Sequence, residues 1–197
     1  FDHTAPTDTS EDKFYPMTFA KGVAAAALAA DEISVTLNGK QLVRNVPSKL
    51  EYRADAKIVA TAKSGAAVTL TSLTPECTYS NGVFTALKGA GQCALAFSTV
   101  ASATTAASSG NFPFILVPGT QKILKMPATL KKGSPKALPL ETNFGVPISY
   151  TSTSKNCQVE GNLVELKKSG VCTMKASAPA KEGMWLALNQ ELRIRVS

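Results

Sequence analysis

Short stretches of alternating apolar and polar residues recur through most of the chain. Two clear examples are residues 66–72 (AAVTLTS) and 146–151 (VPISYT). A period of two places successive side chains on opposite faces of a strand, whereas an amphipathic helix needs a period of 3.6. Asn81-Gly82 and Gly161-Asn162 interrupt the pattern where a hairpin turn needs residues that tolerate positive φ. The pattern predicts an all-β protein built from short, half-buried strands.

The predicted strands recur with an offset of 80 residues. Residues 39–43 (GKQLV) match residues 119–123 (GTQKI). The match continues with an apolar pair, Leu50 and Leu130, a glycine pair, Gly65 and Gly145, and a cysteine pair, Cys77 and Cys157. After one deletion in the second copy, before Gly170, Cys93 also falls on Cys172. We expect residues 39–118 and 119–197 to be two copies of one unit, each a β-sandwich of about seven strands.

The first 38 residues do not fill a whole unit. Residues 33–38 (ISVTLN) match the last strand of a unit, and residues 1–13 are polar and acidic like an arm or linker. Residues 1–38 are therefore expected to be an acidic arm plus a partial unit. Either the chain is a fragment of a longer array, or another chain completes this unit by strand addition.

Apolar residues in this partial unit lack an obvious core. They predict a surface for a protein partner, either a second copy or a neighbouring subunit. The alternative is that they dock back on the first full unit. The residues are Phe14, Tyr15, Met17, Phe19, Ile33, Val35 and Leu37.

The four cysteines occur as one pair in each unit, Cys77 with Cys93 and Cys157 with Cys172. No CxxC occurs, which disfavours zinc ribbons and thioredoxin-like sites. Two local disulfides are predicted, each closing a loop of about 15 residues that is worth about 3 kcal/mol. Four buried free thiols in a cytosolic protein are the alternative. Disulfides are typical of oxidising compartments, so the expected location is extracellular or at a cell surface.

Several motifs together resemble bacterial immunoglobulin-like repeats of secreted and surface proteins, of the actinobacterial type. They are the Gly-x-Gln start, the strand in SGAAVTLTS (residues 64–72), the Cys–Asn-Gly hairpin and the Gly-x-Cys strand. The resemblance covers roughly residues 39–197. It implies two tandem immunoglobulin-like Greek-key sandwiches, an in-domain disulfide and an extracellular place. It implies no activity, because this fold carries many functions.

Few residues could support catalysis or metal binding. The 197-residue chain has one histidine, His3, which disfavours Ser–His–Asp and Cys–His catalysis and multi-histidine metal sites. Glu160 and Glu165 lie on the two strands of one predicted hairpin, but the first unit has Ser80 and Thr85 there. A solvated face explains them better than a pair acting on sugars. The sequence predicts a non-enzymatic protein with no cofactor and no metal.

Charge is unevenly distributed along the chain. The net charge of +7 is the sum of −4 over residues 1–32, +4 over 33–118 and +7 over 119–197. An acidic front and a basic back could attract each other between chains, although scattered lysines also simply keep β surfaces soluble. The chain has four arginines and no aromatic residue near its densest lysine pairs, which disfavours nucleic acid.

An anionic polysaccharide is the other partner that the charge allows. The densest basic positions are Lys131, Lys132, Lys167 and Lys168. Trp185, the single tryptophan, could stack on a sugar ring, or it could pack at the sandwich end or an interdomain contact.

These features predict a structural or adhesive extracellular protein. It would be a spacer or a subunit of a surface assembly such as a fibre, lattice or particle, of cellular or viral origin. The alternative is a glycan-binding module of a larger secreted or phage-associated protein. No membrane span is expected, because the apolar run at residues 23–30 is far shorter than the roughly 20 residues a span needs.

Overall fold

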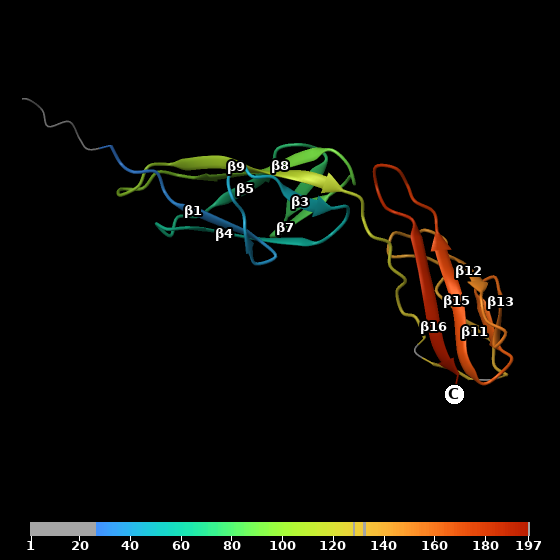
Figure 1. The fold of residues 1–197 in the computed structure, drawn as a ribbon. Helices are drawn as coiled ribbons and strands as arrows, with labels where there is room; N and C mark the ends of the chain where they lie inside the picture. The colour runs from blue at the N-terminus through green and yellow to red at the C-terminus, as the bar shows by residue number, and fades with distance from the viewer. Residues whose placement is uncertain (1–26, 128, 132, 197) are drawn as a thin grey trace, which may run out of the picture.

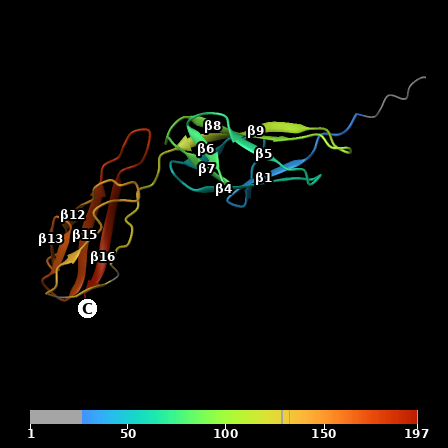
Figure 2. The same ribbon diagram turned by 180° about the vertical axis from the view of Figure 1, so that it is seen from behind.

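A computed structural model describes residues 27–127, 129–131 and 133–196. All regular elements in this part of the chain are strands, and they form two β-sandwiches placed end to end (Figure 1). Figure 2 shows from behind that one short linker after β9 joins them. The expected all-β class with tandem sandwiches is confirmed. No helix that could cross a membrane occurs among the described residues.

The first sandwich packs a five-stranded sheet, in the order β2-β1-β4-β7-β6, against a four-stranded sheet, β3-β9-β8-β5. Its core is aromatic: Phe84 of one sheet lies 5.0 Å from Phe114 of the other, between ring centroids. The strands are β1 (Ile33–Leu37), β2 (Lys40–Gln41), β3 (Ser48–Glu51), β4 (Ala56–Ala62), β5 (Thr69–Ser72), β6 (Cys77–Ser80), β7 (Val83–Ala86), β8 (Gln92–Thr99) and β9 (Ser108–Val117).

The second sandwich has a three-stranded sheet, β11-β14-β13, and a four-stranded sheet, β10-β16-β15-β12. Met174 and Cys172 of β15 and Val164 of β14 are among its most deeply buried core residues. The strands are β10 (Thr129–Leu130), β11 (Lys136–Ala137), β12 (Ser149–Ser152), β13 (Cys157–Glu160), β14 (Leu163–Leu166), β15 (Gly170–Ala178) and β16 (Leu188–Val196).

The pairing of the strands repeats with the offset seen in the sequence. Leu50 lies opposite Leu116 in the first sandwich, and Leu130 lies opposite Val196 in the second, both in parallel pairs. In the first sandwich, Ile58 N–H donates a hydrogen bond to the Gly82 carbonyl. At the same offset in the second sandwich, Leu138 N–H donates to the Asn162 carbonyl. The tandem repeat is therefore confirmed at the level of backbone register.

Each sandwich contains one of the expected disulfides. Cys77 is bonded to Cys93, and Cys157 to Cys172. Each bond joins the hairpin of one sheet (β6 or β13) to the long strand of the other sheet (β8 or β15). The prediction of two local disulfides is confirmed, and the free-thiol alternative is wrong.

The structure differs from the expected partial unit at residues 33–38. β1 pairs antiparallel with β4 over its whole length, from Ile33 opposite Ala62 to Leu37 opposite Ile58, and with β2 on its other side. Val35 is fully buried in the core. The first sandwich therefore begins before residue 39, and β1 is an interior strand of its sheet, with β4 along one side and β2 beside its last two residues on the other. The sequence misled because β1 and β9 have the same apolar alternation.

The candidate partner surface divides accordingly. Val35 is fully buried in the core of its own sandwich, so the expectation that it contacts a partner is wrong. Ile33 and Leu37 are partly buried and pack against that core, and a partner contact through them stays a prediction. Phe14, Tyr15, Met17 and Phe19 lie outside the described residues.

The second sandwich has no strand equivalent to β1 among its described residues. Ile123 pairs with Thr142 as Ile33 pairs with Ala62, but the chain then runs directly to β10. The Tyr150 hydroxyl instead donates a hydrogen bond to the Pro139 carbonyl at 2.9 Å. At the offset of 80, Pro139 corresponds to Val59, which pairs with β1 in the first sandwich. The Tyr150 side chain thus satisfies a backbone carbonyl of the second sandwich at the edge that β1 covers in the first sandwich.

Candidate interaction surfaces

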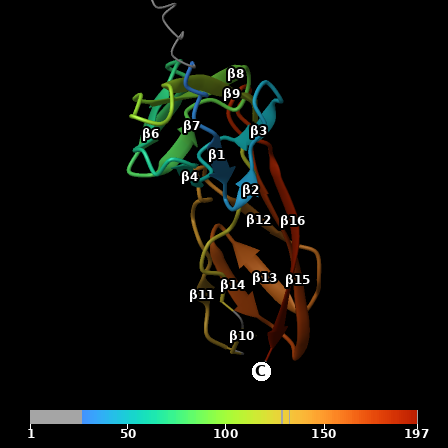
Figure 3. The ribbon, with the colours of Figure 1, turned by 90° about the vertical axis from the view of Figure 1, so that its left-hand side faces the viewer.

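The loop between β15 and β16 reaches from the second sandwich back to the first. Figures 1 and 3 show this loop beside the end of the first sandwich. Gly119 N–H donates to the Met184 carbonyl at 2.8 Å, and Leu186 N–H donates to the Gly119 carbonyl at 3.0 Å. Gly89 N–H of the first sandwich donates to the Gly183 carbonyl at 2.7 Å. Backbone hydrogen bonds therefore fasten this loop to both the linker and the first sandwich.

Three aromatic rings fill the space between the two sandwiches. Tyr52 lies 5.4 Å from Phe144 and 5.8 Å from Trp185, and Phe144 stacks on Trp185 at 5.6 Å, all measured between ring centroids. Tyr52 is only 3% exposed, yet it belongs to neither core cluster. Its burial comes from the junction. We call Tyr52, Phe144 and Trp185 the junction triad.

Two glycines allow the backbones to approach this closely. A Cβ atom on Gly89 would collide with the Met184 carbonyl, which is backbone and cannot move aside easily. A Cβ atom on Gly119 would lie 2.6 Å from the Phe144 ring. Any larger residue would force the sandwiches apart, so these glycines set how closely the two units pack.

Charged groups surround the triad at its rim. Thr120 N–H donates to the Glu51 carboxylate at 2.5 Å, which ties the linker to β3. The Arg53 guanidinium lies 5.3 Å from the Tyr52 ring centroid, and the Lys181 ammonium lies 5.4 Å from that of Trp185. Both distances are within the range of cation–π attraction. The junction therefore has an apolar centre and a polar rim, like a protein–protein interface.

The structure places Trp185 at an interdomain contact, which was one of its two sequence interpretations. Phe144, Tyr52 and Lys181 lie near its indole ring, which is partly buried. Its Nε1 is buried without a hydrogen-bond partner among the described residues.

Sequence reasoning missed Tyr52, Phe144 and Gly89 as junction residues. A signal was available in the repeat, because Tyr52 corresponds to Lys132 at the offset of 80. Where one copy has an aromatic residue and the other a lysine, the two positions cannot have the same surroundings.

The second sandwich carries basic residues at its far end. Strand register brings them together, because Thr129 of β10 lies opposite Arg195 and Gly170 lies opposite Val196. Lys131 directly follows β10, and Lys167 and Lys168 precede β15; all three side chains are exposed. Lys167 is paired with Glu165 at 2.6 Å, so it contributes less net charge. We call Lys131, Lys167, Lys168 and Arg195 the basic end; Lys132 lies outside the described residues.

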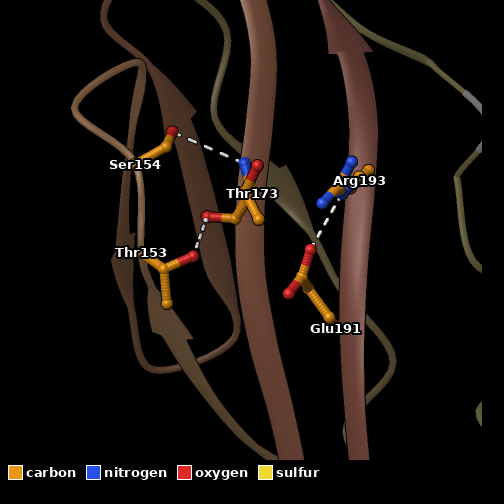
Figure 4. Close-up of polar contacts among 5 residues, drawn as sticks. All are labelled: Thr153, Ser154, Thr173, Glu191 and Arg193. Carbon is orange, nitrogen blue, oxygen red and sulfur yellow. Dashed lines mark hydrogen bonds and ion pairs between the residues drawn. The ribbon is translucent and has the colours of Figure 1, made fainter.

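The outer face of β15 and β16 is polar but mostly self-paired. Figure 4 shows the Arg193 guanidinium donating to the Glu191 carboxylate at 2.8 Å, and the Thr153 hydroxyl donating to the Thr173 carbonyl at 3.2 Å. Thr173 N–H also donates to the Ser154 hydroxyl at 3.4 Å. Because Glu191 is paired with Arg193, Arg193 adds little net charge beside the basic end.

No described part of the chain gathers groups suited to catalysis or metal binding. No cluster of three possible metal ligands occurs there. Glu160 lies opposite Leu163 and Glu165 opposite Gln158, so the two carboxylates are not cross-strand partners. An open groove of about 460 Å³ lies between β2 and β3; its lining includes Val43 and Val46, and Lys40 and Lys49 edge it.

Comparison with known proteins gives no family for this chain. No family model and no curated protein matches it. The chain is similar to domains 4 and 5 of the S-layer protein SbsC at 15% identity, covering 85% of this chain and 99% of that one, with a TM-score of 0.31. It is also similar to a chimeric titin Z1Z2 (11% identity, 86% and 99% covered, TM-score 0.32) and to Drosophila N-cadherin EC1-3 (8% identity, 79% and 65% covered, TM-score 0.31).

Proposed function

We propose that this chain is a non-enzymatic extracellular module whose two immunoglobulin-like sandwiches form a stiff spacer in a surface protein or assembly. The observation that carries the proposal is the junction, where backbone hydrogen bonds and the junction triad hold one sandwich against the other; Tyr52 is buried there, and Phe144 and Trp185 are partly buried. Neighbouring domains move relative to each other by default unless their interface is apolar and well packed. This junction meets that condition at its centre.

The energy of the triad is large enough to matter. An aromatic pair contributes about 0.5–1.5 kcal/mol beyond its buried area. Two of the pairs span the junction, Tyr52 with Phe144 and Tyr52 with Trp185, so together they are worth about 1–3 kcal/mol, about 5-fold to 150-fold in favour of the docked arrangement. The disulfides support the extracellular part of the proposal, because such bonds persist in oxidising compartments.

Small-angle X-ray scattering tests the stiffness. We expect the scattering of the purified chain to fit one elongated arrangement and to stay constant between low and high salt. A matched variant with Gly-Ser-Gly-Ser inserted after Pro118 separates the linker from the loop while leaving both sandwiches whole. This variant should show a broadened distribution of shapes and unchanged melting of its sandwiches. A native chain as variable as the insertion variant would refute the spacer.

A second candidate function is binding of an anionic polysaccharide at the basic end. It is favoured by the register that gathers Lys131, Lys168 and Arg195 at one end of the second sandwich. The equivalent end of the first sandwich carries Glu51 and Tyr52 and is occupied by the junction.

Salt-dependent binding to heparin and polygalacturonate tests this candidate. Each lost cation contact should lower the salt dependence of binding. A K131S/K168S variant should bind more weakly than a K57S/K63S variant, which removes the same charge from the first sandwich. Equal binding by the two variants, or no binding by the native chain, would refute the site.

A further inference from the structure

Strand β5 has an open outer edge. It forms the border of its sheet and pairs only with β8 among the described strands. Leu73 N–H donates to the Ala94 carbonyl, so the backbone groups of Leu73 face β8. Because alternate residues of a strand point their backbone groups to the same neighbour, those of Thr71 and Thr69, two and four residues earlier, also face β8. The N–H and C=O groups of Leu70 and Ser72 therefore point away from the sheet. They offer a partner strand a row of unused donors and acceptors.

This edge lacks the features that usually prevent pairing. Natural sheets protect exposed edges with charges, prolines or bulges. Residues 64–74 contain no charged residue and no proline, and Thr69 and Thr71 are exposed. The border strand β3 of the same sheet carries Lys49 and Glu51, which makes it less suitable.

The residues just before the equivalent strand of the second sandwich are covered. Ile148 N–H donates to the Leu140 carbonyl at 2.9 Å, and Thr142 N–H donates to the Val146 carbonyl at 2.9 Å. Residues 140–142 therefore lie along residues 146–148, which directly precede β12. In the first sandwich the residues corresponding to 140–142, residues 60–62, are held by β1 instead. The presence of β1 thus keeps residues 60–62 away from residues 66–68, which directly precede β5.

We propose that β5 pairs antiparallel with β5 of a second copy of this chain, which joins the two first sandwiches side by side. The register is self-complementary. Leu70 lies opposite Leu70 of the second copy, and Val68 lies opposite its Ser72. Each hydrogen-bonded pair exchanges two bonds, so the contact makes about six backbone hydrogen bonds.

The side chains suit this register. Thr69 lies opposite Thr71 of the second copy on the exposed face, and Thr–Thr pairs are favourable neighbours across strands. No like charges meet. This lateral contact goes beyond the spacer function, because a spacer needs no second copy.

Sedimentation of the full chain over a range of concentrations tests the proposal. We expect a monomer–dimer equilibrium with a dissociation constant below about 1 mM, in the range of a small interface. The variant T69K/T71K places lysines opposite each other twice and should shift dimerisation at least tenfold. Both threonines are exposed, so the monomer should keep its fold, which circular dichroism checks.

The repeat supplies the matched control. S149K/T151K introduces the same charge at the equivalent positions of β12, which belongs to the second sandwich and takes no part in the proposed contact, and should dimerise like the native chain. Dimerisation should not weaken with salt, unlike an association between the acidic front and the basic end. A native chain that stays monomeric up to about 1 mM, or a T69K/T71K variant that dimerises as well as the control, would overturn the proposal.

A cross-linking experiment tests the register. The variants T69C and T71C are mixed under mild oxidation. Residue 69 faces residue 71 of the second copy, with an expected Cα separation of about 4.5 Å, which a disulfide can bridge. The mixture should therefore form at least tenfold more covalent dimer than either variant alone. Equal yields in all three samples would rule out this register.

Discussion

Replacing Tyr52 with alanine should free the two sandwiches from each other while leaving each of them folded. Tyr52 is buried, but its ring belongs to neither core cluster. Its backbone N–H donates to the Val117 carbonyl at 3.0 Å, and an alanine retains that bond. The substitution therefore removes the ring from the junction and little else.

The expected size follows from the contacts that the ring makes. Tyr52 contacts two rings of the second sandwich, Phe144 and Trp185. At about 0.5–1.5 kcal/mol for each pair, the loss is about 1–3 kcal/mol. This lowers the ratio of docked to undocked molecules by about 5-fold to 150-fold.

Distances between two spin labels measure this ratio. The four native cysteines are all in disulfides, so labels can be attached at K57C in β4 and K175C in β15, both exposed positions. We expect one narrow distance distribution for the native background and a broad one for Tyr52→Ala.

Tyr79→Ala is the matched control. Tyr79 packs against the core of the same sandwich and takes part in none of the aromatic pairs of the triad. This variant should lower the melting temperature but keep the narrow distribution. A Tyr52→Ala distribution as narrow as that of the control would refute the reasoning that the triad fixes the junction.

Three further outcomes are expected. Gly89→Ala should broaden the same distance distribution, because its methyl group meets the Met184 carbonyl. Gly65→Ala has open space around its methyl group, so it should leave the distribution unchanged and only strain its own turn. Equal distributions for the two variants would contradict the close approach of Gly89 to the Met184 carbonyl. Tyr150→Phe should lower the free energy of unfolding by about 1 kcal/mol at pH 7, because the hydrogen bond to Pro139 is lost. Burial raises the pKa of Tyr150 above its ordinary 10.0, so the protonated form is favoured in the folded state; the stabilisation is fully present below pH 10 and is lost as the pH rises through the raised pKa. Denaturant titrations should therefore show the gap between the native chain and Tyr150→Phe closing above pH 10, and a constant gap would contradict it. C157S/C172S should lose about 3 kcal/mol in the second sandwich alone, measured by calorimetry, and an equal loss in both sandwiches would show that the disulfides do not act within their own units.

The sequence was most informative where the signal is local or repeated. Alternation in residues 66–72 and 146–151 predicted strands; the first range contains β5, and the second contains all of β12 except Ser152. The recurrence of Cys77 and Cys93 as Cys157 and Cys172 predicted both disulfides. Such predictions succeed because a buried face fixes the period of a strand, and because a repeated unit buries the same positions twice.

The sequence was misleading at residues 33–38 and silent about the junction. An apolar alternation says that ISVTLN is a strand, but not which strand it pairs with, because β1 and β9 have the same period. Similarly, nothing near Tyr52 in the sequence reveals that Phe144 and Trp185 will cover it, since these residues lie about 90 and 130 positions further along the chain. Lys132, which corresponds to Tyr52 in the second unit, showed only that the two units have different surroundings at this position.

The sequence by itself determined the strand class, the repeat, the disulfides and the uneven charge of this protein. Each is a property of neighbouring residues or of residues at one constant offset. Only the tertiary structure decided which edges are covered and which surfaces meet, namely that β1 closes one side of the first sandwich, that β5 stays open, and that the triad joins the two units. The physical reason is that pairing and burial depend on contacts between residues far apart in the chain, which no local pattern specifies.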